Sequence, residues 1–244
     1  MSAGQHTPAS PRAGVLPTPV PKGGGTTLPR VPEPRLATFQ KKLRSAEKKL
    51  ASLDPALGKV IARVGPAELA PTPGFDPFNA LVRSICHQQL HGRAAETIHG
   101  RVLAKFGDGT HGDVKKLFRA RMDSMRSCGL STAKALAIKD LAAKCLDGTV
   151  PDGATLHELS DDEIVERVTH VRGIGRWTVE MMLIFRMGRL DVWPVDDFGV
   201  RKGFTMLRQL KDPITAKALV PHGEAYRPFR SVASWYLWRV ADGR

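Results

Sequence analysis

The stretch VTHVRGIGRWTVEMMLIFRMGRLDVWPVDDFGVRKGF, residues 168–204, carries the pattern that decides the fold. At its centre, Gly173-Ile174-Gly175 separates two helical patterns, one over 161–169 and one over about 176–187. Two glycines allow a tight turn with positive φ and leave the neighbouring backbone N–H groups uncovered. Those amides lie at the start of the second helix, where the helix dipole favours an anion. The stretch predicts a helical hairpin that can hold a phosphate group, although ordinary helix–helix turns also use glycine.

An acidic pair, Asp196-Asp197, precedes another apolar helical pattern, and its second member lies 22 residues after Gly175. An Asp in front of Phe198 is a good N-cap, but a cap needs only one carboxylate. The neighbouring Arg201 and Lys202 form a basic rim, and a carboxylate beside such a rim is where chemistry on a nucleic acid needs it.

Outward from this stretch, apolar residues recur at spacings of three and four from Arg35 onward, which is typical of helices. Hairpin turns flanked by alternating residues are missing, so the sequence predicts an all-α fold. The clearest apolar stripes are Phe78, Leu81, Val82 and Ile85; Ala95, Ile98 and Val102; Ile138, Leu141, Ala142 and Cys145; and Phe229, Val232, Ala233, Tyr236, Leu237 and Val240.

Charge and composition narrow the class of protein. The 244 residues include 37 Lys and Arg against 24 Asp and Glu, a formal net charge of +13, which indicates a polyanionic partner. Neither a membrane span nor a secretory apolar run is present, so we expect an intracellular protein. The basic run from Lys41 to Lys49 is interpreted as a solvated helix face. The cysteines Cys86, Cys128 and Cys145 are too few for a four-thiolate cluster and are expected to be reduced core thiols.

Residues 1–34 differ from the rest, because they hold eight of the 18 prolines and the Gly23-Gly24-Gly25 run. Such a segment buries too little apolar surface to offset its ordering entropy, so we predict a disordered tail.

Four segments together resemble a known family. The run GIGRWT…DVWPVDDFGVRKGF resembles the helix–hairpin–helix and Gly/Pro…Asp motif of a DNA glycosylase superfamily, in its 3-methyladenine DNA glycosylase II branch. FDPFNALVRSICHQQLHGRAAETI, MRSCGLSTAKALAIKDLA and YRPFRSVASWYLWR resemble further segments of that branch, in order, over residues 75–244. The resemblance implies two helical subdomains with an active-site cleft between them: 35–76 with 190–244, and 77–189.

The resemblance also implies an activity: a monofunctional glycosylase that flips out alkylated purines and hydrolyses the N-glycosidic bond in base excision repair. Asp197 matches the catalytic aspartate, which makes Asp196 the better candidate for the N-cap. Trp177 stands where members that also cut the strand have a Schiff-base lysine, and an indole cannot form an imine. The resemblance implies no required cofactor and no iron–sulfur cluster.

Further positions are implied by the same resemblance. Trp177, Trp238 and Met181 match positions that line the pocket for the flipped base, where aromatic faces attract a cationic alkylated purine. A wedge loop would fill the gap left by that base; Gln89 fits the wedge best, and the loop comprises Gln88, Gln89, Leu90 and His91.

The hairpin itself is implied to bind DNA phosphate and a monovalent cation. The phosphate-binding set is Arg172, Gly173, Ile174, Gly175 and Arg176. The cation would be held by the backbone carbonyls of Thr169, Val171 and Ile174. Arg172 stands where the family usually has proline. This departure leaves open whether the hairpin binds the cation, and it adds a candidate phosphate contact.

Two alternatives stay open: a non-catalytic helix–hairpin–helix module that only binds DNA, and a bifunctional glycosylase/lyase. Asp197 and the aromatic C-terminal segment argue against the first, and Trp177 argues against the second. The expected partner is double-stranded DNA with alkylated bases, bound by a monomer that contacts no membrane. Its location would be the nucleoid-containing cytoplasm of a bacterium or the nucleus of a eukaryote.

Overall fold

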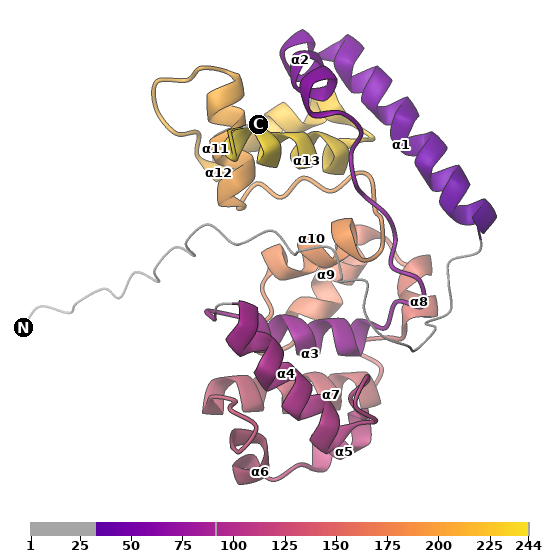
Figure 1. Ribbon diagram of the computed structural model, residues 1–244, viewed down its shortest axis with the longest axis vertical. Helices are drawn as coiled ribbons and strands as arrows, with labels where there is room; N and C mark the ends of the chain where they lie inside the picture. The colour runs from indigo at the N-terminus through magenta and orange to yellow at the C-terminus, as the bar shows by residue number, and fades with distance from the viewer. Residues whose placement is uncertain (1–32, 91, 244) are drawn as a thin grey trace, which may run out of the picture. The chain divides into compact units, whose positions relative to one another are not determined.

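A computed structural model describes residues 33–90 and 92–243 (Figure 1). Within these ranges the chain forms helices and turns without a strand, apart from one isolated bridge between Gly107 and Gly112. The predicted all-α class is confirmed. Most of the predicted N-terminal tail lies outside the described residues, while its last two positions begin helix α1 (Glu33–Leu53).

The described chain divides into two compact units. The first unit contains residues 41–68 and 193–243, and the second contains 33–40 and 69–192. The long helix α1 therefore contributes its first turns to the second unit and its remainder to the first.

The first unit is organised around α13 (Arg230–Ala241), which is buried along most of its length. It packs against α11 (Phe198–Leu207) so closely that a Cβ on Gly203 would lie 2.0 Å from the Leu237 carbonyl oxygen. The remaining helices of this unit are α2 (Pro55–Val64), α12 (Ala216–Leu219) and the 3-10 helix η1 (Val220–Tyr226).

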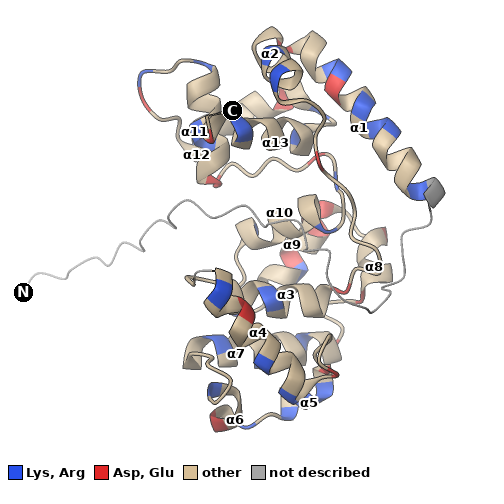
Figure 2. Ribbon diagram, in the orientation of Figure 1, with Lys and Arg blue, Asp and Glu red and all other residues tan. Residues whose placement is uncertain are grey.

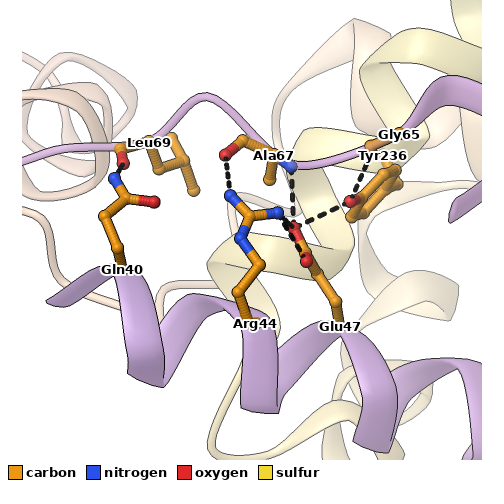
Figure 3. Close-up of polar contacts among 7 residues, drawn as sticks. All are labelled: Gln40, Arg44, Glu47, Gly65, Ala67, Leu69 and Tyr236. Atoms are coloured by element: carbon orange, nitrogen blue, oxygen red, sulfur yellow. Dashed lines mark hydrogen bonds and ion pairs between the residues drawn. The ribbon is translucent and has the colours of Figure 1, made fainter. Parts of the chain in front are cut away.

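Buried polar contacts hold α13 against α1 (Figure 3). The Glu47 carboxylate, only 7% exposed, accepts hydrogen bonds from the Ala67 amide at 2.7 Å and from Arg44 at 2.6 Å. The Tyr236 hydroxyl of α13 lies 3.0 Å from Glu47 Oε1 and 2.9 Å from the Gly65 carbonyl oxygen. These contacts fix the rotation of α13 and hence the direction of its other side chains.

A second buried group fixes the end of α11. Arg208, the C-cap of α11, bonds to the Asp54 carboxylate, and the Tyr226 hydroxyl donates to the same carboxylate at 2.7 Å. Burial alone would raise the pKa of Asp54, but the hydrogen bonds from Tyr226, the Leu57 amide and Arg208 bring that pKa below its ordinary value.

The second unit is built around α7 (Thr132–Leu146), which contacts α3 (Pro77–His87) and α5 (Val114–Arg119). The predicted stripe of α3 is buried as expected, at Phe78, Leu81, Val82 and Ile85. The other helices here are α4 (Gly92–Phe106), α6 (Met122–Arg126), α8 (Gly153–Glu158), α9 (Asp161–Thr169) and α10 (Arg176–Phe185).

Basic residues recur along α1 (Figure 2). Lys41, Lys42, Lys48 and Lys49 are exposed, as a solvated face predicts, whereas Arg44 is half-buried in its ion pair with Glu47. In the described ranges, no helix is both long and apolar enough to cross a lipid bilayer.

Candidate functional site

The hairpin between α9 and α10 has the predicted form (Figure 1). Helix α9 ends at Thr169 and α10 begins at Arg176. Between them Gly173 takes a φ of 76°, which an L side chain rarely adopts, and Ile174 is buried at 4% exposure. The Ile174 amide donates to the Val171 carbonyl at 3.0 Å, which closes the turn.

The N-terminus of α10 differs from most helix starts in its unit, although α6 also begins without a side-chain cap. The N-cap of α10 is Gly175, which offers no side-chain hydrogen bond. Neighbouring helices start at residues whose side-chain oxygens accept from the first turn: Asp76, Asp113, Ser131, Asp152 and Ser160. A Cβ built on Gly175 would meet nothing within 4 Å. The start of α10 is therefore open to an anion from outside the chain.

The two predicted basic residues of the hairpin have different surroundings. The Arg176 guanidinium forms ion pairs with Glu180 at 3.1 Å and Asp162 at 3.8 Å, so its charge is partly neutralised within the unit. Arg172 is exposed, and its backbone amide donates to Asp140 Oδ2 at 2.7 Å. Asp140 lies on α7 and was not anticipated, because nothing in the local sequence links it to a turn 32 residues away.

The candidate pocket residues of α10 lie one turn apart. Trp177 is 40% exposed although it is a large apolar side chain, and Met181 is half-buried. Residues four apart share one face of a helix, so α10 presents both side chains in the same direction. The exposed Trp177 indole therefore lies one residue into α10, beside the open helix start.

The candidate wedge residues form a tight turn after α3. Gln88 has φ −55° and ψ 128°, Gln89 has φ 57°, and the Leu90 amide donates to the His87 carbonyl at 3.3 Å. This is the geometry of a type II turn, in which the third position usually needs glycine. Gln89 and Leu90 are exposed, while Gln88 is half-buried and donates through Nε2 to the Gly173 carbonyl at 2.8 Å. His91 lies outside the described residues.

The acidic pair divides its roles differently from our expectation. Asp197, not Asp196, is the N-cap of α11: its Oδ1 accepts from the Val200 amide at 2.8 Å. Asp197 is also buried at 8% exposure, whereas Asp196 is exposed. The expectation that Asp196 supplies the cap was wrong, because α11 begins at Phe198 and the cap is the residue directly before the first helical one.

Trp238 reaches the same carboxylate. Its Nε1 donates to Asp197 Oδ1 at 2.7 Å, and the indole is 4% exposed. Gly199 makes this approach feasible, because a Cβ there would lie 2.6 Å from the Trp238 ring. The family resemblance implied a place for Trp238 in the base pocket and gave no sign of this hydrogen bond, which joins residues 41 positions apart.

The cysteines match the expected core thiols: all three are free, Cys86 and Cys128 are buried, and Cys145 is half-buried. Burial raises the pKa of Cys86 and of Cys145 to about 12, so neither thiol forms a thiolate near neutral pH. Within the described part of the chain, no group of three His, Cys, Asp or Glu side chains could hold a metal ion.

The predicted residues thus fall into two groups. The hairpin, the turn after α3, Trp177 and Met181 belong to the second unit, and Gln88 brings the first two together. Asp197 and Trp238 belong to the first unit and contact each other.

Comparison with known proteins identifies the family. The model of the HhH-GPD superfamily of base excision DNA repair proteins matches residues 82–224. A curated relative, DNA-3-methyladenine glycosylase 1 of Schizosaccharomyces pombe, is 35% identical over 202 residues, covering 82% of this chain and 88% of its own.

Two solved structures have similar folds at 34% identity. A 3-methyladenine DNA glycosylase of Schizosaccharomyces pombe in complex with abasic DNA has a TM-score of 0.69, over 80% of this chain and 95% of its own. A DNA-3-methyladenine glycosidase of Bacillus halodurans has a TM-score of 0.73, over 80% of this chain and 88% of its own. With the family match and the relative above, these similarities lead to one assignment: this chain belongs to the HhH-GPD superfamily of base excision DNA repair proteins.

Proposed function

We propose that this protein is a monofunctional DNA glycosylase that removes alkylated purines of the 3-methyladenine type and leaves an abasic site. The observation that carries the proposal is the buried Asp197 carboxylate, fixed by the Val200 amide and the Trp238 indole N–H, in a chain with a DNA-repair hairpin. The relatives named above are glycosylases of this substrate class, which supports the same assignment.

Asp197 is the proposed catalytic residue. Cleavage of an N-glycosidic bond passes through a transition state with oxocarbenium character, and a nearby carboxylate stabilises the positive charge that develops on the sugar. Two donors on Oδ1 hold the carboxylate in one orientation, so little reorganisation is needed when that charge appears. Asp197 also orients the attacking water or takes a proton from it.

The second unit is proposed to bind and open the DNA. The α10 amides and Arg172 hold a backbone phosphate, which gives affinity without reading sequence. Gln89 enters the space left by the flipped base, and Trp177 with Met181 contacts that base. An alkylated purine is cationic, and an exposed indole face attracts it by stacking and by a cation–π contact.

The absence of an amine at position 177 supports the monofunctional assignment. A strand-cutting glycosylase needs a nucleophilic amine that forms an imine with the sugar C1′, and Trp177 has none. The product strand should then remain intact, with an abasic site in place of the damaged nucleotide.

The remaining proposals concern cofactors, partners and location. No cofactor is needed for base release, and no iron–sulfur cluster is proposed. The carbonyls of Thr169, at the C-terminal end of α9, and of Val171 and Ile174, in the turn that follows, would hold a monovalent cation. The protein acts as a monomer on double-stranded DNA, in the nucleoid of a bacterium or the nucleus of a eukaryote.

Mass spectrometry of bases released from methylated duplex DNA tests the function. Alkylated purines should appear as free bases, and the strand should break only after heat or alkali. Sodium borohydride added during turnover should trap no covalent adduct. Absence of free alkylated bases would refute the glycosylase assignment, and a borohydride-stable adduct would refute the monofunctional one.

A further inference from the structure

The turn His87–Leu90 is held in an unfavourable backbone conformation. Its third residue, Gln89, has a φ of 57°, which residues other than glycine adopt rarely. Its one internal hydrogen bond, from the Leu90 amide to the His87 carbonyl, is 3.3 Å long. Contacts from outside the turn must therefore help to maintain it.

The Gln88 side chain supplies such a contact. Its Nε2 donates to the Gly173 carbonyl at 2.8 Å, so the turn is joined to the centre of the hairpin, 85 residues further along the chain. While the Gln88 carboxamide is bonded to the Gly173 carbonyl, the Gln88 side chain cannot also insert into the DNA. Gln88 and Gln89 therefore have separate roles.

The Gly173 carbonyl is a fixed anchor because α7 holds the same turn from another side. The Asp140 carboxylate accepts from the Arg172 amide at 2.7 Å, one peptide unit before Gly173. Lys144, one turn further along α7, donates to the other carboxylate oxygen at 2.5 Å and keeps Asp140 in place. Within the same helix, Lys134 donates to the Cys86 carbonyl at 2.8 Å and fixes the end of α3.

We infer that Gln88 is a positioning residue that couples the phosphate-binding hairpin to the wedge turn. Its hydrogen bond to Gly173 keeps Gln89 in the left-handed conformation in which its side chain can fill the vacated space. This inference rests on the proposed function, because it assigns the two glutamines to separate tasks in base flipping. Gln88 itself contacts neither the damaged base nor the gap.

A double-mutant cycle tests the coupling. Gln88→Met keeps the length of the side chain and removes the donor. Gln89→Gly removes the wedge side chain and suits the positive φ, so the turn no longer needs support. The measurement is the ratio of affinities for a duplex with an abasic site and for the undamaged duplex. Gln88→Met should lower this ratio about tenfold, the size of one lost hydrogen bond, and affinity for undamaged DNA should hardly change.

In the Gln89→Gly background the same Gln88→Met substitution should change the ratio less than about twofold, because the group it positions is gone. Equal losses in both backgrounds would overturn the inference and make Gln88 an independent DNA contact. Thermal unfolding of both single variants identifies any loss that comes from misfolding.

Hydrogen–deuterium exchange of the free protein provides a second readout that does not depend on activity. Gln88→Met should accelerate exchange in peptides covering 86–93 and 170–176, whereas Gln89→Gly should not. Unchanged exchange in Gln88→Met would refute the coupling even if the protein proves to be a glycosylase. Faster exchange without release of alkylated bases would support the coupling and contradict the proposed function.

Discussion

Helices α10 and α11 begin in opposite ways. The N-cap of α10 is Gly175, which provides no capping side chain, and the space around its missing Cβ is open. The N-cap of α11 is Asp197, a buried carboxylate that accepts from the Val200 amide and from Trp238. The first-turn amides of both helices have no partner within the helix, and the helix dipole attracts negative charge to each N-terminus. The N-terminus of α10 can take its anion from a ligand, whereas the N-terminus of α11 already has the Asp197 carboxylate.

In the proposed function, this difference separates DNA binding from catalysis. An uncapped start attracts phosphate wherever DNA presents it, without reading sequence. A carboxylate already seated on its helix holds an orientation before substrate arrives, which lowers the cost of stabilising charge in the transition state. Four substitutions test whether the two starts carry these separate tasks.

Asp197→Asn should have the largest effect. The Asn Oδ1 can still accept from Val200 and Trp238, so the helix start remains intact while the negative charge is lost. Base release should fall about a thousandfold or more, as expected when one strong electrostatic contribution is removed. The matched control is Asp196→Asn, because Asp196 is exposed and does not cap the helix. This variant should release the base at a rate within about twofold of the wild type. Similar rates for both variants would contradict the assignment.

Trp238→Phe should have the next largest effect. It removes the N–H that donates to Asp197 and retains an aromatic ring. One hydrogen bond to a charged group is lost, so base release should fall roughly ten- to hundredfold. Trp235→Phe makes a similar cavity on the same helix, where the Trp235 ring meets Tyr236 edge-to-face and lies against the Arg239 guanidinium instead. If both variants lose activity equally, the effect comes from packing.

Gly175→Val tests the open helix start. The N-cap conformation, φ −95° and ψ 167°, suits a β-branched residue, and its Cβ would meet no neighbour within 4 Å, so the fold should persist. The added side chain should shield the amides and weaken binding about tenfold for damaged and undamaged duplexes alike. Fluorescence anisotropy with both duplexes measures this effect. Gly100→Val, another exposed position with no neighbour within 4 Å, should bind as the wild type does.

Arg172→Gln should have the smallest effect. Its backbone amide still bonds to Asp140, and only the guanidinium charge is lost. Affinity should fall a few-fold for any sequence, and the slope of log affinity against log salt concentration should decrease by about 1. Arg119→Gln, at an exposed position at the end of α5, should leave the slope unchanged. An unaltered slope in Arg172→Gln would remove Arg172 from the phosphate contact.

Local patterns predicted most of the helices and the hairpin, because apolar periodicity and paired glycines act over a few residues. The stripe of α3 and the turn at Gly173 are examples. The choice between Asp196 and Asp197 as the cap was wrong, since it depends on the exact start of α11, which helical periodicity does not resolve. The contacts of Gln88 with Gly173 and of Trp238 with Asp197 join distant positions, so no local pattern could show them.

A single-turnover measurement tests the division of tasks most directly. Enzyme in excess is mixed with a duplex carrying one alkylated purine, and base release is followed as enzyme concentration increases. The Gly175→Val rate should approach the wild-type rate at saturation, because only binding is weakened. The Asp197→Asn rate should stay about a thousandfold lower at every concentration, although that variant binds abasic DNA as tightly as the wild type. An Asp197→Asn rate within about tenfold of wild type at saturation would contradict the account.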